Sequence, residues 1–156
     1  MGKKLKILFL CTGNSCRSQM AEGWVRALKA GTIKAYSAGI EIHGLNPFAV
    51  KVMAEAGVDI SNNISQTIDE FKGEDLDAVI TVCGHAHETC PWFAPSCRVI
   101  HVGFEDPPTL AEELADQGAG PEKQLDCYRR VRDEIKAFVL GLPDNINLDE
   151  IQYDNK

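Results

Sequence analysis

The stretch of sequence that decides the fold is Cys11-Thr12-Gly13-Asn14-Ser15-Cys16-Arg17-Ser18. An apolar run, residues 7–10, precedes it, and an amphipathic stretch, residues 19–29, follows it. A buried strand that enters a short, glycine-containing polar loop and then a helix directs several backbone N–H groups toward one point, where the helix dipole adds positive potential. We call these residues the 11–18 loop and expect it to bind a tetrahedral oxyanion.

Cys11 and Arg17 carry the chemistry of this loop, and five residues separate them. Arg17 offers a planar, permanently charged fork for two oxyanion oxygens. Because a cation and a helix N-terminus both favour the thiolate of a nearby cysteine, we expect Cys11 to be a nucleophile. The alternative is a buried apolar cysteine beside an ordinary surface arginine. The position of the pair between a strand and a helix, with Gly13 and Asn14 inside, favours the catalytic interpretation.

The composition is typical of one soluble globular domain, to which we assign residues 1–156. A net charge of −7 and a pI near 5.1 argue against nucleic acid or an anionic membrane as the partner. The apolar run before Cys11 is too short for an export signal or a membrane span. We therefore expect the six cysteines to be thiols in a reducing cytoplasm, where cysteine pairs are metal ligands or redox catalysts more often than structural disulfides.

Hydrophobic periodicity and helix start and stop signals predict the order of the elements. The predicted strands are residues 5–10, 33–38, 76–82 and 98–102. The predicted helices are residues 19–29, 46–57, 67–71, 85–90, 109–117, with Thr109 as the cap, and 122–140. This alternation predicts an α/β fold, a three-layer sandwich with a four-stranded parallel sheet and a site at the carboxyl ends of its strands.

Two further motifs give the sequence a resemblance to a known family. Asp106-Pro107 follows the fourth predicted strand, and together with the 11–18 loop it resembles the general-acid loop and phosphate loop of the low-molecular-weight protein tyrosine phosphatases. Cys83 and Cys90, with six residues between them, follow the third strand. This pair is similar to that of the thioredoxin-coupled arsenate reductases, a branch of the same fold, and is not expected in the phosphatases. The resemblance extends from Leu5 to about Leu140.

The resemblance implies that the 11–18 loop binds arsenate. The loop amides and Arg17 would hold the oxyanion while Cys11 attacks it. Ser18 would hydrogen-bond the Cys11 thiolate, and Asp106 would protonate the departing oxygen. An alternative role for Asp106, read from the residues alone, is to cap a turn before two prolines.

The resemblance also implies a relay of three cysteines. Cys83 would attack Cys11, release arsenite and leave a transient Cys11–Cys83 disulfide. Cys90 would then attack Cys83, and thioredoxin would reduce the resulting Cys83–Cys90 disulfide. We expect no cofactor and a monomeric protein. The alternative activity is that of a low-molecular-weight phosphatase, which would hydrolyse phosphotyrosine-like esters without thioredoxin.

Some members of the family hold a potassium ion beneath the loop, with an Asn, a Glu, a Thr and an Asp as ligands. Asn14 and Glu22 match the first two positions. Ile64 and Gln66 stand at the other two and offer neither a hydroxyl nor a charge. We therefore expect no functional potassium site.

The remaining cysteines and histidines allow other interpretations. A structural zinc site is the alternative for Cys83, His85, His87 and Cys90, but their spacing matches no common zinc knuckle and would leave the nucleophile unexplained. Cys16 is a loop residue without an assigned step. Cys97 and Cys127 are expected in the core, because free cysteine is among the most buried residue types.

The spacing of Cys83 and Cys90 predicts a conformational change. Seven residues span about 10.5 Å on an α-helix, whereas a disulfide tolerates a Cα separation of at most about 7 Å. A helix over residues 85–90 would be short, with Gly84 at its start and Pro91 at its end. We expect this segment to be helical when reduced and to unwind outward when Cys83 and Cys90 are oxidised.

Overall fold

The structure, a computed structural model, describes residues 4–90 and 97–146. Its centre is a sheet of four parallel strands in the order β2-β1-β3-β4. The strands are β1 (Leu5–Cys11), β2 (Ile33–Gly39), β3 (Ala78–Thr81) and β4 (Arg98–His101). The predicted four-stranded parallel sheet is thus confirmed, and β3 is shorter at both ends than the sequence predicts.

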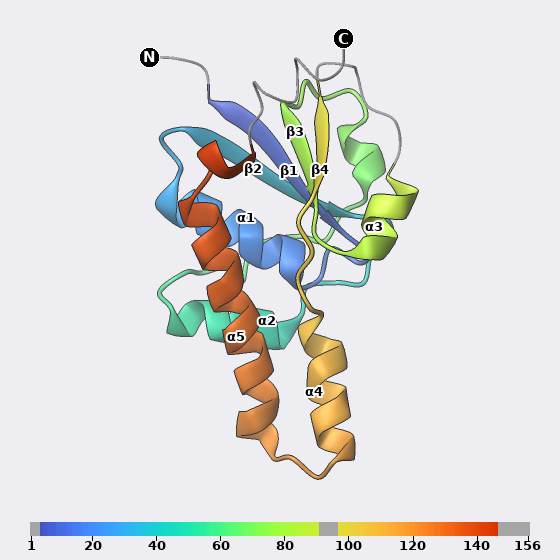
Figure 1. The fold of residues 1–156 in the computed structure, drawn as a ribbon, viewed down its shortest axis with the longest axis vertical. Coiled ribbons are helices and arrows are strands. Elements are labelled where there is room, and N and C mark those ends of the chain that lie inside the picture. Colours follow the sequence, from blue (N-terminus) through green and yellow to red (C-terminus); the bar gives the residue numbers. More distant parts are fainter. Residues whose placement is uncertain (1–3, 91–96, 147–156) are drawn as a thin grey trace.

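Helices surround this sheet (Figure 1). They are α1 (Arg17–Leu28), α2 (Pro47–Glu55), α3 (Gly84–Thr89), α4 (Pro107–Asp116) and α5 (Pro121–Leu140), with short 3₁₀ helices η1 (Ile68–Phe71) and η2 (Asp144–Ile146). The core explains the apolar run before the 11–18 loop. Ile7, Leu8, Phe9 and Leu10 of β1 are all fully buried. Because successive side chains of a strand point to opposite faces, both faces of β1 are covered, as the predicted α/β architecture requires.

Parallel pairing brings the ends of the strands to one edge of the sheet. Leu10 of β1 pairs with Ala38 of β2 and with Thr81 of β3. Thr81 in turn pairs with His101 of β4. The 11–18 loop, the segment after β2 and the start of α3 therefore meet at the carboxyl edge, where the sequence places the site.

Two helix starts show how local sequence sets the boundaries. Asn46 caps α2, as predicted, by accepting hydrogen bonds from the N–H groups of Phe48 and Ala49 at 2.8 and 3.3 Å. The predicted start of the helix at Thr109 is wrong, because α4 begins at Pro107 with Asp106 as its N-cap residue. Proline favours the first helical turn, since its fixed φ suits the helix and its missing N–H has no partner to lose.

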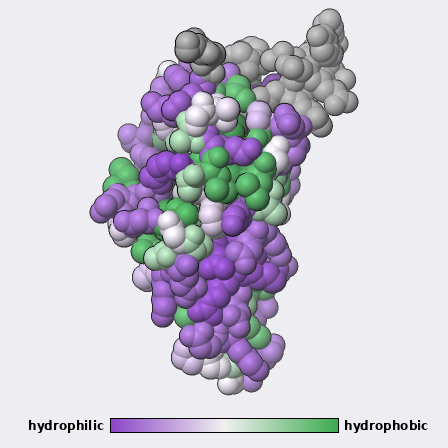
Figure 2. All heavy atoms as spheres, turned by 90° about the vertical axis from the view of Figure 1, so that its left-hand side faces the viewer, coloured by the Kyte–Doolittle hydropathy of each residue, from purple (hydrophilic) through white to green (hydrophobic). Residues whose placement is uncertain are grey.

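Helices α4 and α5 form an antiparallel hairpin whose loop end lies far from the sheet (Figure 1). No helix of the described residues is long and apolar enough to span a membrane. Figure 2 views the molecule from the side of α2 and α5, and hydrophilic side chains cover most of the lower half of this face.

Candidate active site

The 11–18 loop connects the end of β1 to the start of α1. Its carbonyl groups face the surrounding chain: those of Thr12, Gly13 and Ser15 accept hydrogen bonds from the backbone N–H groups of Glu41, His43 and Asn46 at 2.9–3.0 Å. In the part of the chain that the structure describes, no hydrogen bond has a donor among the N–H groups of residues 13–16. These N–H groups are therefore available to an anion, as the strand–loop–helix pattern predicts.

Asn14 is the structural centre of the loop. It is fully buried and has a positive φ of 48°, a conformation that asparagine adopts more readily than most residues. Its side-chain oxygen accepts from the N–H of Gln66 at 2.8 Å and from Nε2 of Gln19 at 3.1 Å. Its Nδ2 donates to Oγ of Ser18 at 2.9 Å. Asn14 thus fixes both the loop and the serine at the start of α1.

Ser18 in turn contacts the expected nucleophile. The Ser18 Oγ lies 2.9 Å from the Cys11 Sγ. The serine oxygen also accepts from Asn14, and its hydroxyl hydrogen can be donated to the sulfur when Cys11 is a thiolate. Cys11 is only 3% exposed and lies where α1 begins. The sulfur of Cys11 therefore lies beside a serine hydroxyl at the start of a helix.

Arg17 is held across the mouth of the loop. One of its terminal nitrogens donates to the carbonyl oxygen of Phe104 at 3.0 Å, and the other lies 3.3 Å from the Asp106 carboxylate. Asp106 also accepts a hydrogen bond of 2.7 Å from the hydroxyl of Thr109. Asp106 is therefore the N-cap residue of α4, although its side chain makes no cap hydrogen bond to the helix backbone, and it lies beside Arg17 at the pocket.

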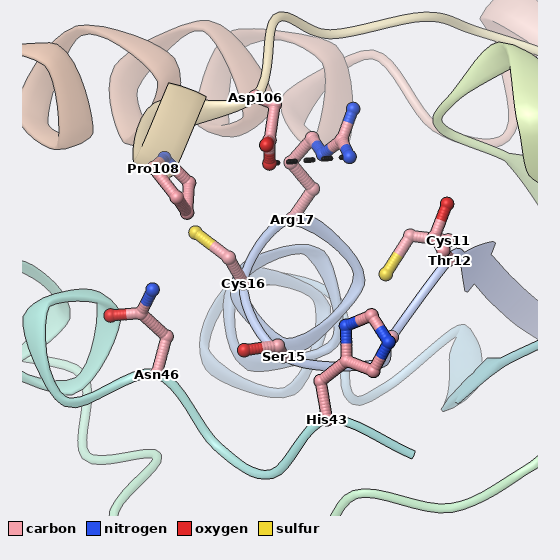
Figure 3. A pocket seen from close by; sticks show the side chains of 10 residues that line it. Cys11, Thr12, Ser15, Cys16, Arg17, His43, Asn46, Asp106 and Pro108 are labelled. Carbon is pink, nitrogen blue, oxygen red and sulfur yellow. Dashed lines mark ion pairs between the residues drawn. The ribbon is translucent and has the colours of Figure 1, made fainter. Parts of the chain in front are cut away.

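These side chains line a pocket of about 440 Å³ (Figure 3). Its lining residues are Cys11, Thr12, Gly13, Ser15, Cys16, Arg17, His43, Asn46, Asp106 and Pro108. The structure thus brings together the 11–18 loop and Asp106, which are about ninety residues apart in the sequence.

Besides Pro108 of α4, sequence reasoning missed two residues of this pocket, His43 and Asn46. They come from the segment between β2 and α2, and His43 also pairs with Glu41 at 2.8 Å. A Cβ on Gly13 would meet the ring of His43 at 2.2 Å, so glycine is what allows the imidazole to pack on the loop. The available signal was the position of this segment after β2, the strand beside β1.

Cys83 lies next to the 11–18 loop, and Cys90 lies at the far end of α3. The Cys83 Sγ is 3.2 Å from the Thr12 hydroxyl. It also accepts a hydrogen bond of 3.4 Å from the N–H of Ala86, which lies in the first turn of α3. Cys90 is half-buried, and this burial raises the pKa of its thiol.

All six cysteines of the sequence are described, and all are thiols rather than disulfides. Helix α3 confirms the short helix predicted here, while Pro91, its expected stop, lies outside the described residues.

The other cysteines differ in their surroundings. Cys16 is 4% exposed in the pocket, and burial raises its pKa far above the ordinary range, with the charges of Asp106 and Cys11 adding to the effect. Cys97 packs against the core, and burial raises its pKa to about 11. The expectation that Cys127 is a core residue is wrong: it lies on the partly exposed flank of α5, with its Sγ 3.8 Å from the Lys123 carbonyl oxygen.

The candidate metal positions have partners from the protein itself. Nε2 of Gln19 donates to two oxygens of Asn14 at 3.1 Å and to the Ile64 carbonyl at 2.9 Å. Glu22 accepts a 2.6 Å hydrogen bond from Ser37, and burial raises the pKa of its carboxyl. Over residues 4–90 and 97–146, no group of three or more His, Cys, Asp or Glu side chains is arranged to hold a metal ion.

Comparison with known proteins agrees with this geometry. Residues 6–151 match the family model described as low molecular weight phosphotyrosine protein phosphatase. The chain is 49% identical over 135 residues to an arsenate reductase of Halalkalibacterium halodurans, covering 86% of this chain and 91% of that protein. It is 51% identical over 129 residues to an arsenate reductase of Bacillus subtilis, covering 83% and 88%. A solved structure titled an arsenate reductase in the phosphate binding state is 33% identical, with a TM-score of 0.67 and coverage of 92% and 99%. The chain belongs to the low molecular weight phosphotyrosine protein phosphatase family.

Proposed function

We propose that this protein is an arsenate reductase that converts arsenate to arsenite through Cys11, Cys83 and Cys90 and takes its electrons from thioredoxin. One observation carries the proposal: a second buried thiol, Cys83, contacts the loop that holds the first, Cys11, through the Thr12 hydroxyl at 3.2 Å. A phosphatase needs only the first thiol. The identities of about 50% to named arsenate reductases support the same activity.

The first step uses the pocket. Arsenate binds to the N–H groups of residues 13–16 and to Arg17, whose guanidinium lines the cavity. The Cys11 thiolate, favoured by the Ser18 hydroxyl, attacks arsenic, and an oxygen leaves as water after taking a proton from Asp106. For this role Asp106 must carry a proton when the oxygen departs, and its place beside Arg17 brings it to the bound anion.

The electrons move in the second step. The Cys83 thiolate attacks the Cys11 sulfur, the S–As electron pair passes to arsenic, and As(V) leaves as As(III) in arsenite. The two thiols lose two electrons and form the Cys11–Cys83 disulfide. Cys90 then attacks Cys83, Cys11 leaves as a thiolate, and thioredoxin reduces the Cys83–Cys90 disulfide to complete the cycle. Without a resolving thiol, Cys11 could support only group transfer and hydrolysis.

The proposal includes the form in which the protein works: a single-domain monomer in a reducing cytoplasm, without a bound cofactor. The six thiols support a reducing compartment. Light scattering on the purified protein should give a mass near 17.1 kDa. A mass of twice this value would contradict the monomer.

The test is a coupled assay that supplies arsenate, thioredoxin, thioredoxin reductase and NADPH and that measures arsenite directly. Wild type should turn over many times. Cys90→Ser should release at most one arsenite per chain and stall as a Cys11–Cys83 disulfide that peptide mapping identifies, and Cys127→Ser, outside the relay, is the matched control. Rapid hydrolysis of an aryl phosphate without arsenite formation would instead identify a phosphatase, and sustained turnover by Cys90→Ser would overturn the relay.

A further inference from the structure

Thr81, the last residue of β3, connects two histidines that the active site does not use. It is fully buried, and its Oγ lies 3.1 Å from Nδ1 of His87 on α3 and 2.9 Å from Nδ1 of His101 at the end of β4. The two imidazole rings also contact each other, with centroids 4.8 Å apart and an interplanar angle of 37°. We call Thr81, His87 and His101 the Thr81 cluster. It joins α3 to the carboxyl ends of two strands.

One hydroxyl can bond both rings at once. A threonine hydroxyl has one hydrogen to donate, and its oxygen can accept. Thr81 can therefore donate to the Nδ1 of one histidine and accept from the Nδ1–H of the other, with the two ring tautomers set to match. Within residues 4–90 and 97–146 this hydroxyl has one other bond, to the Ile100 carbonyl, which is long at 3.5 Å. The two histidines therefore depend on the same buried hydroxyl.

Helix α3 needs such anchors because it is short. It has six residues, and isolated helices of this length are unstable in water. Ala86 is fully buried against the sheet, whereas His85, His87 and Glu88 are exposed. The Cys83 cap holds the start of the helix, and the bond from His87 to Thr81 holds its middle.

We propose that the Thr81 cluster is a latch that keeps α3 helical in the reduced enzyme and so delays the meeting of Cys90 with Cys83 until Cys83 has reacted with Cys11. This inference rests on the relay proposed above. His87 stands four residues after Cys83 and three before Cys90. Closing the Cα separation from about 10.5 Å in a helix to the 7 Å or less that a disulfide tolerates has to pull His87 away from Thr81.

The latch acts on one step of the relay. Cys83 precedes α3 and already lies beside Thr12, so its attack on Cys11 leaves the helix in place. In the next step the Cys90 thiolate attacks the Cys83 sulfur, the Cys11–Cys83 bond breaks, the Cys83–Cys90 bond forms and Cys11 leaves as a thiolate, with no net change in electrons. Only this step requires the latch to open. Thr81, His87 and His101 are therefore positioning residues.

The first test is the reduction potential of the Cys83–Cys90 couple, measured in a Cys11→Ser background so that no Cys11–Cys83 bond can form. Thr81→Val keeps the shape of the buried side chain and removes the hydroxyl. Its bond to His101 is lost in both redox states, whereas its bond to His87 is lost from the reduced state only. The disulfide should be favoured about 3–10-fold, which corresponds to a potential lower by about 15–30 mV. His87→Phe, which keeps a ring at the surface, should shift the potential in the same direction. Adding it to Thr81→Val should shift the potential little further, and Glu88→Gln on the same helix is the control.

The second test separates the latch from the relay by amide exchange in the fully reduced protein. Exchange in residues 84–90 should be faster in Thr81→Val and His87→Phe and unchanged in Glu88→Gln. If wild type forms the Cys83–Cys90 disulfide but neither exchange nor potential changes in the variants, the latch is overturned and the relay stands. If wild type never forms this disulfide during arsenate turnover, the relay is overturned, and the role of the latch in it falls too. Should Thr81→Val fail to fold, His87→Phe carries both tests, because its side chain is exposed.

Discussion

We expect Ser18 to set how readily Cys11 reacts. Its hydroxyl lies 2.9 Å from the Cys11 sulfur and can donate to it when Cys11 attacks as a thiolate, which has no proton of its own to give. Hydrogen bonds to charged groups contribute about 1.5–3 kcal/mol, so Ser18→Ala should slow alkylation of Cys11 at pH 7 by about 10-fold or more. Mass-resolved iodoacetamide labelling measures this rate. Ser61→Ala, an exposed serine outside the site, should leave it unchanged, and an equal rate in Ser18→Ala would show that other groups hold the thiolate.

Asp106 has the geometry of two roles, and one substitution separates them. Asp106→Asn keeps the size of the side chain and an oxygen for the Thr109 hydroxyl, but it cannot protonate the leaving oxygen. General acid catalysis contributes about 10²–10⁴-fold, so kcat for arsenate should fall within this range. KM should not rise, because the amide has the size of the carboxyl group and adds no negative charge beside the anion. Steady-state kinetics, with Asp116→Asn on the same helix as the control, give both constants; an unchanged kcat would leave Asp106 only its capping role.

Gln19 gives a physical reason to expect no response to potassium. Its amide nitrogen lies within 3.1 Å of two oxygens of Asn14 and of the Ile64 carbonyl oxygen. These oxygens therefore already have an N–H partner from the chain itself. The melting temperature and the turnover rate should agree between KCl and NaCl at equal ionic strength, to within about 1 °C and the error of the assay. Stabilisation by several degrees in potassium alone would show that other oxygens complete a site.

At the scale of elements, the sequence predicts what depends on neighbouring residues. The apolar run of β1, the 11–18 loop and the Asn46–Pro47 start of α2 are local patterns, and the structure confirms them. The prediction for Cys127 was wrong because burial on α5 depends on which face of the helix is turned toward the core. Leu125 and Tyr128 lie on the buried face, and Cys127 lies beside that face. His43 enters the pocket only because the segment after β2 bonds to the carbonyl of Gly13, a tertiary contact that no local pattern records.

Helix α3 should change its structure with oxidation, since its ends carry Cys83 and Cys90. In oxidised wild type we expect amide exchange of residues 84–90 to rise by at least about 10-fold, because the disulfide cannot form across an intact helix. Oxidised Cys90→Ser, held as a Cys11–Cys83 disulfide, should keep the slow exchange of the reduced enzyme. Hydrogen exchange with mass spectrometry resolves this segment. Equal exchange in the oxidised and reduced wild type would mean that α3 does not unwind.

At the scale of the whole molecule, buried and exposed carboxylates give stability opposite dependences on pH. Arg129 of α5 forms two 2.9 Å hydrogen bonds to Glu55 of α2. Its hydrogen bond lowers the pKa of Glu55. Because the pKa of Glu55 is lower in the folded state, the stabilisation is present when the pH is above the pKa of the unfolded state, near 4.3. It is lost as the pH falls through the pKa of the folded state. This pair therefore contributes to stability at neutral pH.

Glu22 acts in the opposite direction. Burial raises the pKa of its carboxyl, and the hydrogen bond from Ser37 offsets only part of that effect. Below the unfolded pKa, near 4.3, the folded and unfolded forms are both protonated and Glu22 has no penalty; as the pH rises through the folded pKa, a buried charge forms and stability is lost. Glu22→Gln keeps an oxygen for Ser37 and removes this charge. We therefore expect its melting temperature to exceed that of wild type by about 2–4 °C at pH 7, with the difference shrinking toward pH 4. Calorimetry at both pH values measures this difference in melting temperature, and Glu70→Gln, at an exposed position, is the control. If Glu22→Gln is destabilised at pH 7 instead, the Glu22 charge has a stabilising partner.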